Sequence, residues 1–466
     1  MSFKNHTGSF AQKLIKLTAT IVDWRPDTPF YYGWLVIGTA ATGAFAATGV
    51  AQIVIGGIQG LILDDMSWSR STIAFAVTAG TLASGILSPF IGKLADRYGP
   101  RFLMPLAALV VGLCYFALAN IHTIWQFYIA YIIARAIANP NLIGIVPQTV
   151  SVNFFQRKRN FVLGITSMAR PVGGAINIQI IMLIAQAFSW RHAYRYLGVF
   201  SLILILPLFM IMRRKPEDIG LNPDGDPDSS EEINSGSVPS LQPRANKPEF
   251  SWEVREAIGT SAFWLIVIAE TLSILTAGAL SFHSVPFLED SGLAKGLAAT
   301  ALSISVLLGA IVNPGWGYLS DKFSPRTLGL VALTATILAT SLFLIAIFRD
   351  STTIGFMAVI TWGLASGGVN ILSNMMMARY FGRNSYGSIT GLTGPFKLVG
   401  LGIGPALGAI LHNTTGGYYI LFIYAIGAYL LAIILIFYAR QPSLPPRAMI
   451  QENSSTERGK SNGSDK

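Results

Sequence analysis

Charged residues are scarce in this sequence. Asp, Glu, Lys and Arg together make up 12% of its 466 residues, whereas apolar residues make up 52%. A soluble globular protein carries about 25% charged residues, so this composition excludes an ordinary soluble domain. The apolar runs are about 20 residues long, which is enough to cross a bilayer as helices. We therefore expect an all-α integral membrane protein.

Several chemical signatures are also missing. The single cysteine, Cys114, excludes an intrachain disulfide. The sequence lacks the phosphate-binding loop G-x-x-x-x-G-K-[ST], which argues against an ATP-driven pump. The five histidines and the cysteine show no metal-ligand spacing. We expect no cofactor and no metal. An enzyme is disfavoured because no nucleophile–base constellation is evident.

The net charge of +10 has two interpretations, nucleic-acid binding or an excess of Lys and Arg in cytoplasmic loops, and we favour the second. One set of span ends holds the two termini together with Lys93, Arg97, Arg101, Arg157, Lys158, Arg159, Arg213, Arg214, Lys215, Lys322, Arg326, Arg379 and Arg383. The other set holds Arg70, Arg191, Arg195, Lys295 and Arg349. The positive-inside rule then predicts that both termini are cytoplasmic.

Hydropathy predicts twelve spans in two halves. The first six lie near 32–59, 70–92, 102–119, 124–153, 160–187 and 193–212. The last six lie near 259–288, 297–318, 327–348, 353–380, 385–411 and 417–439. We expect an N-terminal segment (1–31), an N-terminal bundle (32–212), a flexible linker (213–258), a C-terminal bundle (259–440) and a disordered tail (441–466).

A repeated motif supports the division into halves. Gly92–Arg101 reads G-K-L-A-D-R-Y-G-P-R, and Gly317–Arg326, about half a chain later, reads G-Y-L-S-D-K-F-S-P-R. The Arg-Asn pair at 159–160 before the fifth span recurs at 383–384 before the eleventh. Such duplication predicts two six-helix bundles that face each other across a cavity near the bilayer midplane.

The repeated loop resembles the signature of the major facilitator superfamily of secondary transporters. The first copy matches through Gly92, Asp96, Arg97, Gly99 and Arg101. The second keeps Gly317, Asp321, Lys322 and Arg326 but has Ser324 in place of the usual glycine. The resemblance, which covers about residues 30–440, implies a monomeric twelve-helix transporter of the plasma membrane that works by alternating access.

Further stretches resemble the bacterial monocarboxylate-transporter and oxalate/formate-antiporter branch. They are Tyr32-Gly33-Trp34, Trp68-Ser69-Arg70, Asn153–Asn160, Lys215–Asp226 and Ala378–Asn384. The branch implies a small mono- or dicarboxylate as substrate and proton symport as coupling. In that branch a lysine in helix eleven serves the anion, and Lys397 lies in the matching helix. The branch also tends to carry a basic residue in helix eight, whereas Leu297–Tyr318 holds no charge.

Charges inside the spans are the main candidates for chemistry, because each costs at least about 2.5 kcal/mol at the helix centre. Arg170 and Lys397 come from opposite halves and lie near mid-span, a placement that suits an organic anion. An alternative for Arg170 is an internal ion pair with Glu270. Glu270 is either a proton carrier or a permanent counter-ion of Arg170 or Lys397.

Other polar residues in the spans have weaker assignments. Arg135 is expected to support the bundle. His283 is a second candidate for proton coupling, with a structural role as the alternative. Asn370 and Asn374 lie four residues apart on one helix face, and together with Trp362 they are candidates for lining the cavity, with helix packing as the alternative.

The two repeated loops are predicted to form a conformational gate. The pseudo-symmetry sets Asp96 against the start of helix eleven (Asn384, Ser385), and Asp321 against the start of helix five (Asn160). A carboxylate is favourable near a helix N-terminus, so we expect both loops to latch the bundles in the outward-open state. Alternative functions are export of drugs or other amphiphiles and a membrane sensor that does not transport.

Overall fold

The computed structural model describes residues 28–68, 70–225 and 252–443. The described part contains twelve helical segments long and apolar enough to cross a membrane and no strand. The prediction of an all-α membrane fold with twelve spans is therefore confirmed. Most of the expected N-terminal segment, the centre of the linker and nearly all of the tail lie outside the described residues.

The N-terminal half consists of helices from Tyr32 to Ile211. They are α2 (Tyr32–Ala47), η1 (Thr48–Val50), α3 (Gln52–Met66), α4 (Arg70–Tyr98), α5 (Pro100–Ala119), α6 (Ile124–Ala138), η2 (Asn139–Ile143), α7 (Ile145–Phe154), α8 (Arg159–Ala187), α9 (Trp190–Ile203) and α10 (Ile205–Ile211). Six spans arise from these pieces, because helices one, four and six are interrupted.

The C-terminal half has the same plan. Its helices are α13 (Ser261–Asp290), α14 (Lys295–Ile311), α15 (Asn313–Lys322), α16 (Pro325–Arg349), α17 (Thr352–Phe381), α18 (Tyr386–Gly391), α19 (Gly394–Thr415) and α20 (Tyr419–Tyr438). Helix eight is divided between α14 and α15, and helix eleven between α18 and α19. Proline at the start of α15 and of α19 accounts for these divisions.

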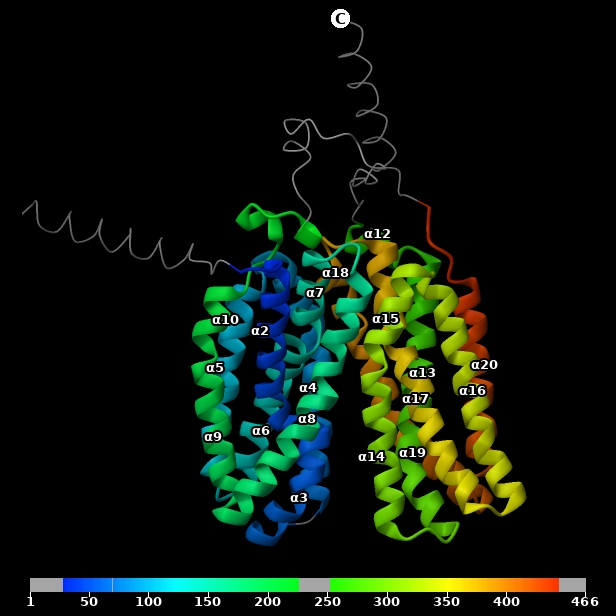
Figure 1. Cartoon of the computed structure of the whole chain (residues 1–466). Coiled ribbons are helices and arrows are strands. Elements are labelled where there is room, and N and C mark those ends of the chain that lie inside the picture. Colours follow the sequence, from blue (N-terminus) through cyan, green and yellow to red (C-terminus); the bar gives the residue numbers. More distant parts are fainter. Residues whose placement is uncertain (1–27, 69, 226–251, 444–466) are drawn as a thin grey trace, which may run out of the picture.

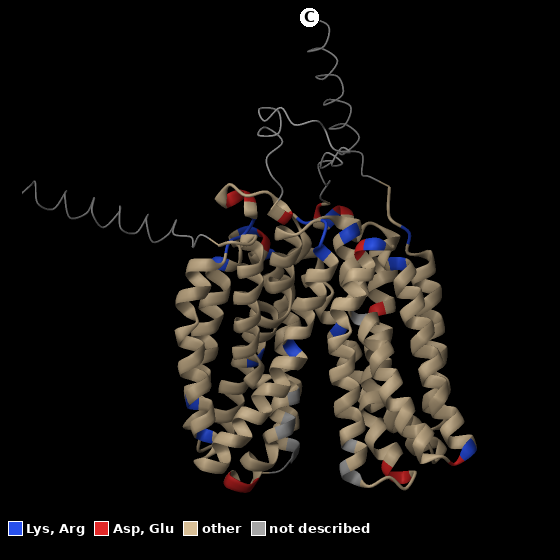
Figure 2. Cartoon of the chain, viewed as in Figure 1, with Lys and Arg blue, Asp and Glu red and all other residues tan. Residues whose placement is uncertain are grey.

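Each half has its own hydrophobic core. Figure 1 shows the two bundles meeting at the end that carries the linker, here called the linker end, and diverging at the opposite end. Most contacts between the bundles run along two sets of helices, α4 with α18 and α19, and α8 with α14 and α15. Most Lys and Arg residues gather at the linker end (Figure 2).

Helix one is broken between α2 and α3, which the sequence analysis did not predict. Ala51 has an extended backbone (φ −67°, ψ 148°), so nearby carbonyls lose their helical partners. Side chains from other helices satisfy them: Tyr115 at Ala46, Asn177 at Phe45, Tyr194 at Gly49, and Tyr131 with Arg135 at Val50. Buried irregular backbone in a membrane requires such partners.

Both ends of the predicted flexible linker are folded. The segment after α10 forms η3 (Pro216–Ile219) and η4 (Pro223–Gly225), and α12 (Val254–Ile258) precedes α13. Trp252 is buried, and its amide donates to the carbonyl of Phe381 at 3.1 Å. Residues 213–225 and 252–258, which the sequence analysis placed in the flexible linker, thus contain short helices.

Candidate functional site

A charged cluster lies inside the C-terminal bundle. Lys397 Nζ on α19 is 2.8 Å from Glu270 Oε1 on α13. The same ammonium group donates to Asn374 Oδ1 on α17 at 3.4 Å. The Glu270 side chain is 5% exposed and that of Lys397 is 31% exposed. The cluster therefore combines a buried carboxylate with a cation that solvent can reach.

Glycine residues bring α19 close to α13. A Cβ on Gly400 would lie 2.7 Å from the Thr271 carbonyl oxygen, and one on Gly404 would overlap the Leu275 carbonyl. Small residues at these positions allow the backbones to approach. The close approach places Lys397 beside Glu270 and selects one partner from the two that the sequence left open.

Arg170 lies on α8, in the other bundle, with an exposed side chain. Within the described residues we find no hydrogen bond or ion pair of its guanidinium group, and its charged neighbour is Arg135. The alternative of an Arg170–Glu270 ion pair is not observed, because Glu270 pairs with Lys397. Arg170 is thus a cation without a counter-ion in the part of the chain that the structure describes.

Three other candidates occupy different surroundings. Trp362 is buried in the C-terminal core and donates from Nε1 to Tyr429 Oη at 3.4 Å, so it does not line an open cavity in this conformation. His283 is also buried, with Nε2 3.2 Å from the Pro405 carbonyl oxygen, and it joins α13 to α19. The side chain of Asn370 lies outside the described residues.

Arg135 is buried within the N-terminal bundle. Its Nε donates to Thr81 Oγ1 at 2.9 Å, and its NH1 group donates to the Val50 carbonyl at 3.0 Å. Arg135 therefore holds helix four against the break in helix one.

The repeated aspartates face helix starts in the opposite bundle. Asp96 accepts from the backbone amides of Gly387 (3.0 Å) and Ser388 (2.6 Å) on α18. Asp321 accepts from the amides of Asn160 (3.2 Å) and Phe161 (3.3 Å) on α8. Asp321 thus meets the expected residue, Asn160, whereas Asp96 contacts helix eleven at Gly387 and Ser388, a few residues after the expected Asn384 and Ser385.

The motif glycines sit where the bundles are closest. A Cβ on Gly92 would overlap the carbonyl oxygen of Gly387, and one on Gly317 would overlap that of Asn160. Gly164 on α8 makes a similar approach, since its Cβ would lie 2.6 Å from the Asn313 carbonyl oxygen. These positions require glycine because backbone faces backbone across the interface.

The motif cations lie at helix ends, Arg97 in the last turn of α4, Lys322 in the last turn of α15 and Arg326 in the first turn of α16. Arg97 stacks on Tyr98 and Lys322 on Tyr318. Arg326 donates to the carbonyls of Ile436 and Phe437 at the end of α20. Gly99, with φ of +74°, packs against the Arg214 side chain. Glycine suits this position because its backbone is left-handed and because a Cβ would come too close to Arg214.

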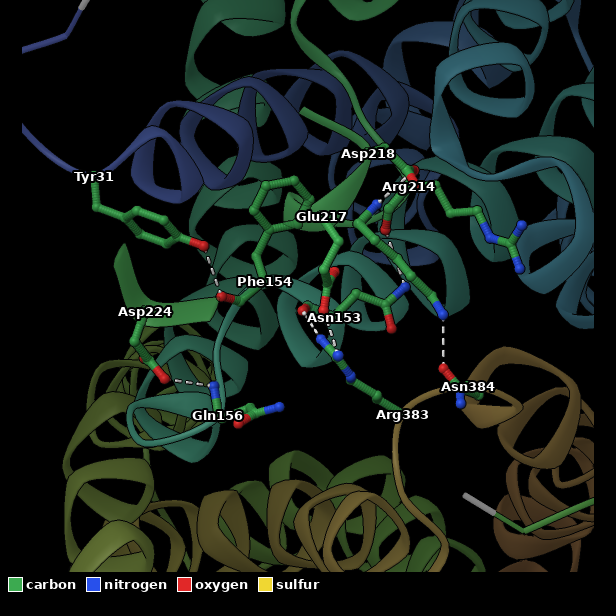
Figure 3. A network of polar contacts seen from close by, with 11 residues as sticks. Tyr31, Asn153, Phe154, Gln156, Arg214, Glu217, Asp218, Asp224, Arg383 and Asn384 are labelled. Atoms are coloured by element: carbon green, nitrogen blue, oxygen red, sulfur yellow. Dashed lines mark hydrogen bonds and ion pairs between the residues drawn. The ribbon is translucent and has the colours of Figure 1, made fainter. Parts of the chain in front are cut away.

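The folded start of the linker bridges the two bundles (Figure 3). Glu217 forms an ion pair with Arg383, and Lys215 Nζ donates to Asn384 Oδ1 at 2.7 Å. Arg383 also donates to the Asn153 carbonyl at 3.2 Å. The contacts of Lys215 and Glu217 with helix eleven were not predicted from the sequence, although the stretches Lys215–Asp226 and Ala378–Asn384 contain both sides of the bridge.

Asp224 anchors the same segment on the N-terminal bundle. Its carboxylate accepts from the amides of Gln156 (2.8 Å), Arg157 (2.7 Å) and Lys158 (3.3 Å), just before α8. Burial, together with the neighbouring Arg214 and Arg383, lowers the pKa of Lys215. The segment is therefore fixed at several points, and its cations repel one another.

Comparison with known proteins agrees with this architecture. The model of the Major Facilitator Superfamily matches residues 40–400. An MFS-type transporter of Gibberella moniliformis is 26% identical over 85% of this chain and 88% of its own. The oxalate:formate antiporter of Oxalobacter formigenes is 23% identical over 74% of this chain and 78% of its own.

The fold is also similar to that of a solved structure. The proton:xylose symporter XylE, bound to 6-bromo-6-deoxy-D-glucose, superposes with a TM-score of 0.65 at 12% identity. The match covers 88% of this chain and 96% of that one, and it supports the fold alone. The family match extends over most of the sequence, so this chain belongs to the Major Facilitator Superfamily of membrane transporters.

Proposed function

We propose that this transporter moves a small organic anion, a mono- or dicarboxylate, together with a proton. The observation that carries the proposal is the pairing of Lys397 with Glu270 in one bundle, while Arg170 in the other has an exposed side chain and no described counter-ion. Arg170 supplies a fork for a carboxylate, and Lys397 supplies a mobile point charge. The similarity to an oxalate:formate antiporter favours the same substrate class.

The ion pair explains how anion and proton are coupled. While Glu270 is ionised, it neutralises Lys397 at 2.8 Å, and an incoming carboxylate competes with a buried anion. Protonation of Glu270 removes that competitor and leaves Lys397 free to bind the substrate. When the anion leaves while Glu270 is still protonated, Lys397 has no counter-ion, and such an uncompensated charge is costly. Release of the anion therefore favours release of the proton from Glu270. Asn374 holds the ammonium group in place during the exchange.

We place the protein in the plasma membrane, with the linker end on the cytoplasmic side. The excess of Lys and Arg at this end supports the assignment. With that orientation the bundles are closed toward the cytoplasm and diverge toward the outside (Figure 1). The contacts of Asp96 and Asp321 then act as latches of the outward-open state. Opening to the cytoplasm requires both to break.

Uptake by purified protein in proteoliposomes tests this function. We expect inward accumulation of at least one of radiolabelled formate, lactate, oxalate and benzoate when the outside is more acidic. Lys397→Gln should reduce uptake about 10- to 100-fold, since a hydrogen bond to a charged group contributes about 1.5–3 kcal/mol. A matched control is Lys158→Gln, which removes an exposed lysine outside the membrane spans.

Three results would contradict the proposal. Wild-type uptake by Lys397→Gln would exclude the lysine as the anion site. Transport of lipophilic cations in place of carboxylates would favour the exporter, and ligand binding without any flux would favour the sensor.

A further inference from the structure

A cavity of about 470 Å³ opens at the linker end of the N-terminal bundle. It lies between the first repeated loop and the segment that follows α10. Four arginines and one aspartate line it together with apolar residues, and the charged ones are Arg97, Arg101, Arg213, Arg214 and Asp218. The cavity is distinct from the site of Lys397 and Arg170, and its lining is strongly positive.

Neighbouring groups hold these arginines in position. Arg213 is buried and donates to the carbonyls of Met210 (2.7 Å) and Met212 (3.0 Å). The guanidinium of Arg101 lies 4.9 Å from the centre of the Phe209 ring, and Arg214 packs against Gly99. A cluster that is fixed before its ligand arrives loses little side-chain entropy on binding.

An apolar surface continues from the cavity along the bundle. Phe102, which lines the cavity, is exposed on α5. Leu106 and Leu113 lie on the same helix face and are exposed as well. Leu206 on the adjacent α10 is also exposed. These side chains belong to a membrane-spanning helix pair, so the surface next to the arginines faces lipid tails.

We propose that this cavity binds the phosphate headgroup of an anionic phospholipid. Guanidinium groups bind phosphate oxygens in a bidentate manner, and basic pockets at the cytoplasmic side of membrane helices suit anionic headgroups. The exposed face of α5 receives the acyl chains. The cytoplasmic leaflet as the source of the lipid follows from the proposed orientation, whereas the choice of ligand follows from the arginines and the apolar face.

Binding of phosphatidylglycerol to the full-length protein in neutral detergent tests the proposal without any transport assay. Native mass spectrometry counts bound lipids, and the lipid-dependent rise in Tm gives an apparent affinity. Phosphatidylglycerol should bind at least about tenfold more weakly to Arg97→Gln/Arg214→Gln than to the wild type, because each arginine near a headgroup contributes about 1 kcal/mol. Phosphatidylcholine should bind both proteins weakly.

A matched variant separates the site from general charge. Arg379→Gln/Arg440→Gln removes two exposed arginines from the same end of the other bundle and should retain wild-type binding. Equal loss of phosphatidylglycerol binding in both double variants, or no loss in Arg97→Gln/Arg214→Gln, would overturn the proposed site. Saturation by glycerol 3-phosphate with displacement of the lipid would overturn the lipid assignment in favour of a soluble phosphoester. Since no flux is measured, failure of carboxylate transport leaves this test intact.

Discussion

The carboxylate of Asp96 accepts a hydrogen bond from the backbone amide of Ser388 at 2.6 Å, across the interface between the two bundles. The bond joins the first repeated loop to the start of helix eleven. It combines a charge-assisted hydrogen bond with the favourable field at a helix N-terminus. Asp321 makes the equivalent contact with Asn160 and Phe161. The two halves are therefore joined twice by the same interaction, an aspartate that accepts backbone amides at a helix start of the opposite bundle.

Asp96→Asn is expected to shift the population toward the state that is open at the linker end. The substitution keeps the size of the side chain but removes its charge, which contributes about 1 kcal/mol, or about fivefold in population. Ser320 is buried at this interface, so maleimide labelling of Ser320→Cys reports the opening. The labelling rate should rise in Asp96→Asn.

Asp350→Asn is the matched control for that experiment. Asp350 is exposed and ends α16 with φ of +46°, a conformation that asparagine tolerates. The Asp350→Asn substitution should leave the labelling rate of Ser320→Cys unchanged. An unchanged rate in Asp96→Asn as well would contradict the latch.

Gly317→Ala should open the same interface by steric overlap. Its Cβ would collide with the carbonyl of Asn160, whereas a Cβ on Gly315, two residues earlier on α15, meets nothing within 4 Å. Both changes add one methyl group to the same helix. Proteolysis or labelling at the linker end should increase for Gly317→Ala only. Equal behaviour of the two variants would show that the backbone contact does not control the gate.

Asp224→Asn should destabilise the folded part of the linker. Its carboxylate accepts three amides before α8, and loss of such a charged cap costs about 1 kcal/mol. Thermal unfolding in detergent should show a lower Tm than wild type. Asp64→Asn, an exposed aspartate on α3, should leave Tm unchanged, and a Tm loss of the same size in both would indicate a general charge effect.

The main features of the fold follow from the sequence, because long apolar runs can only be membrane helices and the repeated loop marks two equivalent halves. The break in helix one, in contrast, does not follow from the sequence. Thr48-Gly49-Val50 contains no proline, and the residues that stabilise its free carbonyls, such as Tyr115 and Tyr194, lie far away in sequence. The folded linker ends were missed for a similar reason, since Glu217 depends on Arg383.

The candidate site follows from the sequence only in part. Buried charges are easily recognised, so Lys397, Glu270 and Arg170 stand out among the apolar residues. Their pairing depends on how closely α13 approaches α19, which Gly400 and Gly404 determine. Trp362 is buried in the core, the alternative that the sequence left open, because an aromatic residue on a helix gives no sequence signal of whether it faces the core or a cavity.

The central claim is that Glu270 couples the proton to the anion by competing for Lys397. The most direct measurement compares the accumulation of the transported carboxylate with and without an inward proton gradient, for wild type and Glu270→Gln. Glu289→Gln on the same helix serves as the control. The proposed coupling predicts that Glu270→Gln still exchanges carboxylate across the membrane but loses accumulation driven by the gradient, while Glu289→Gln retains it. Gradient-driven accumulation by Glu270→Gln at the wild-type level would contradict the account.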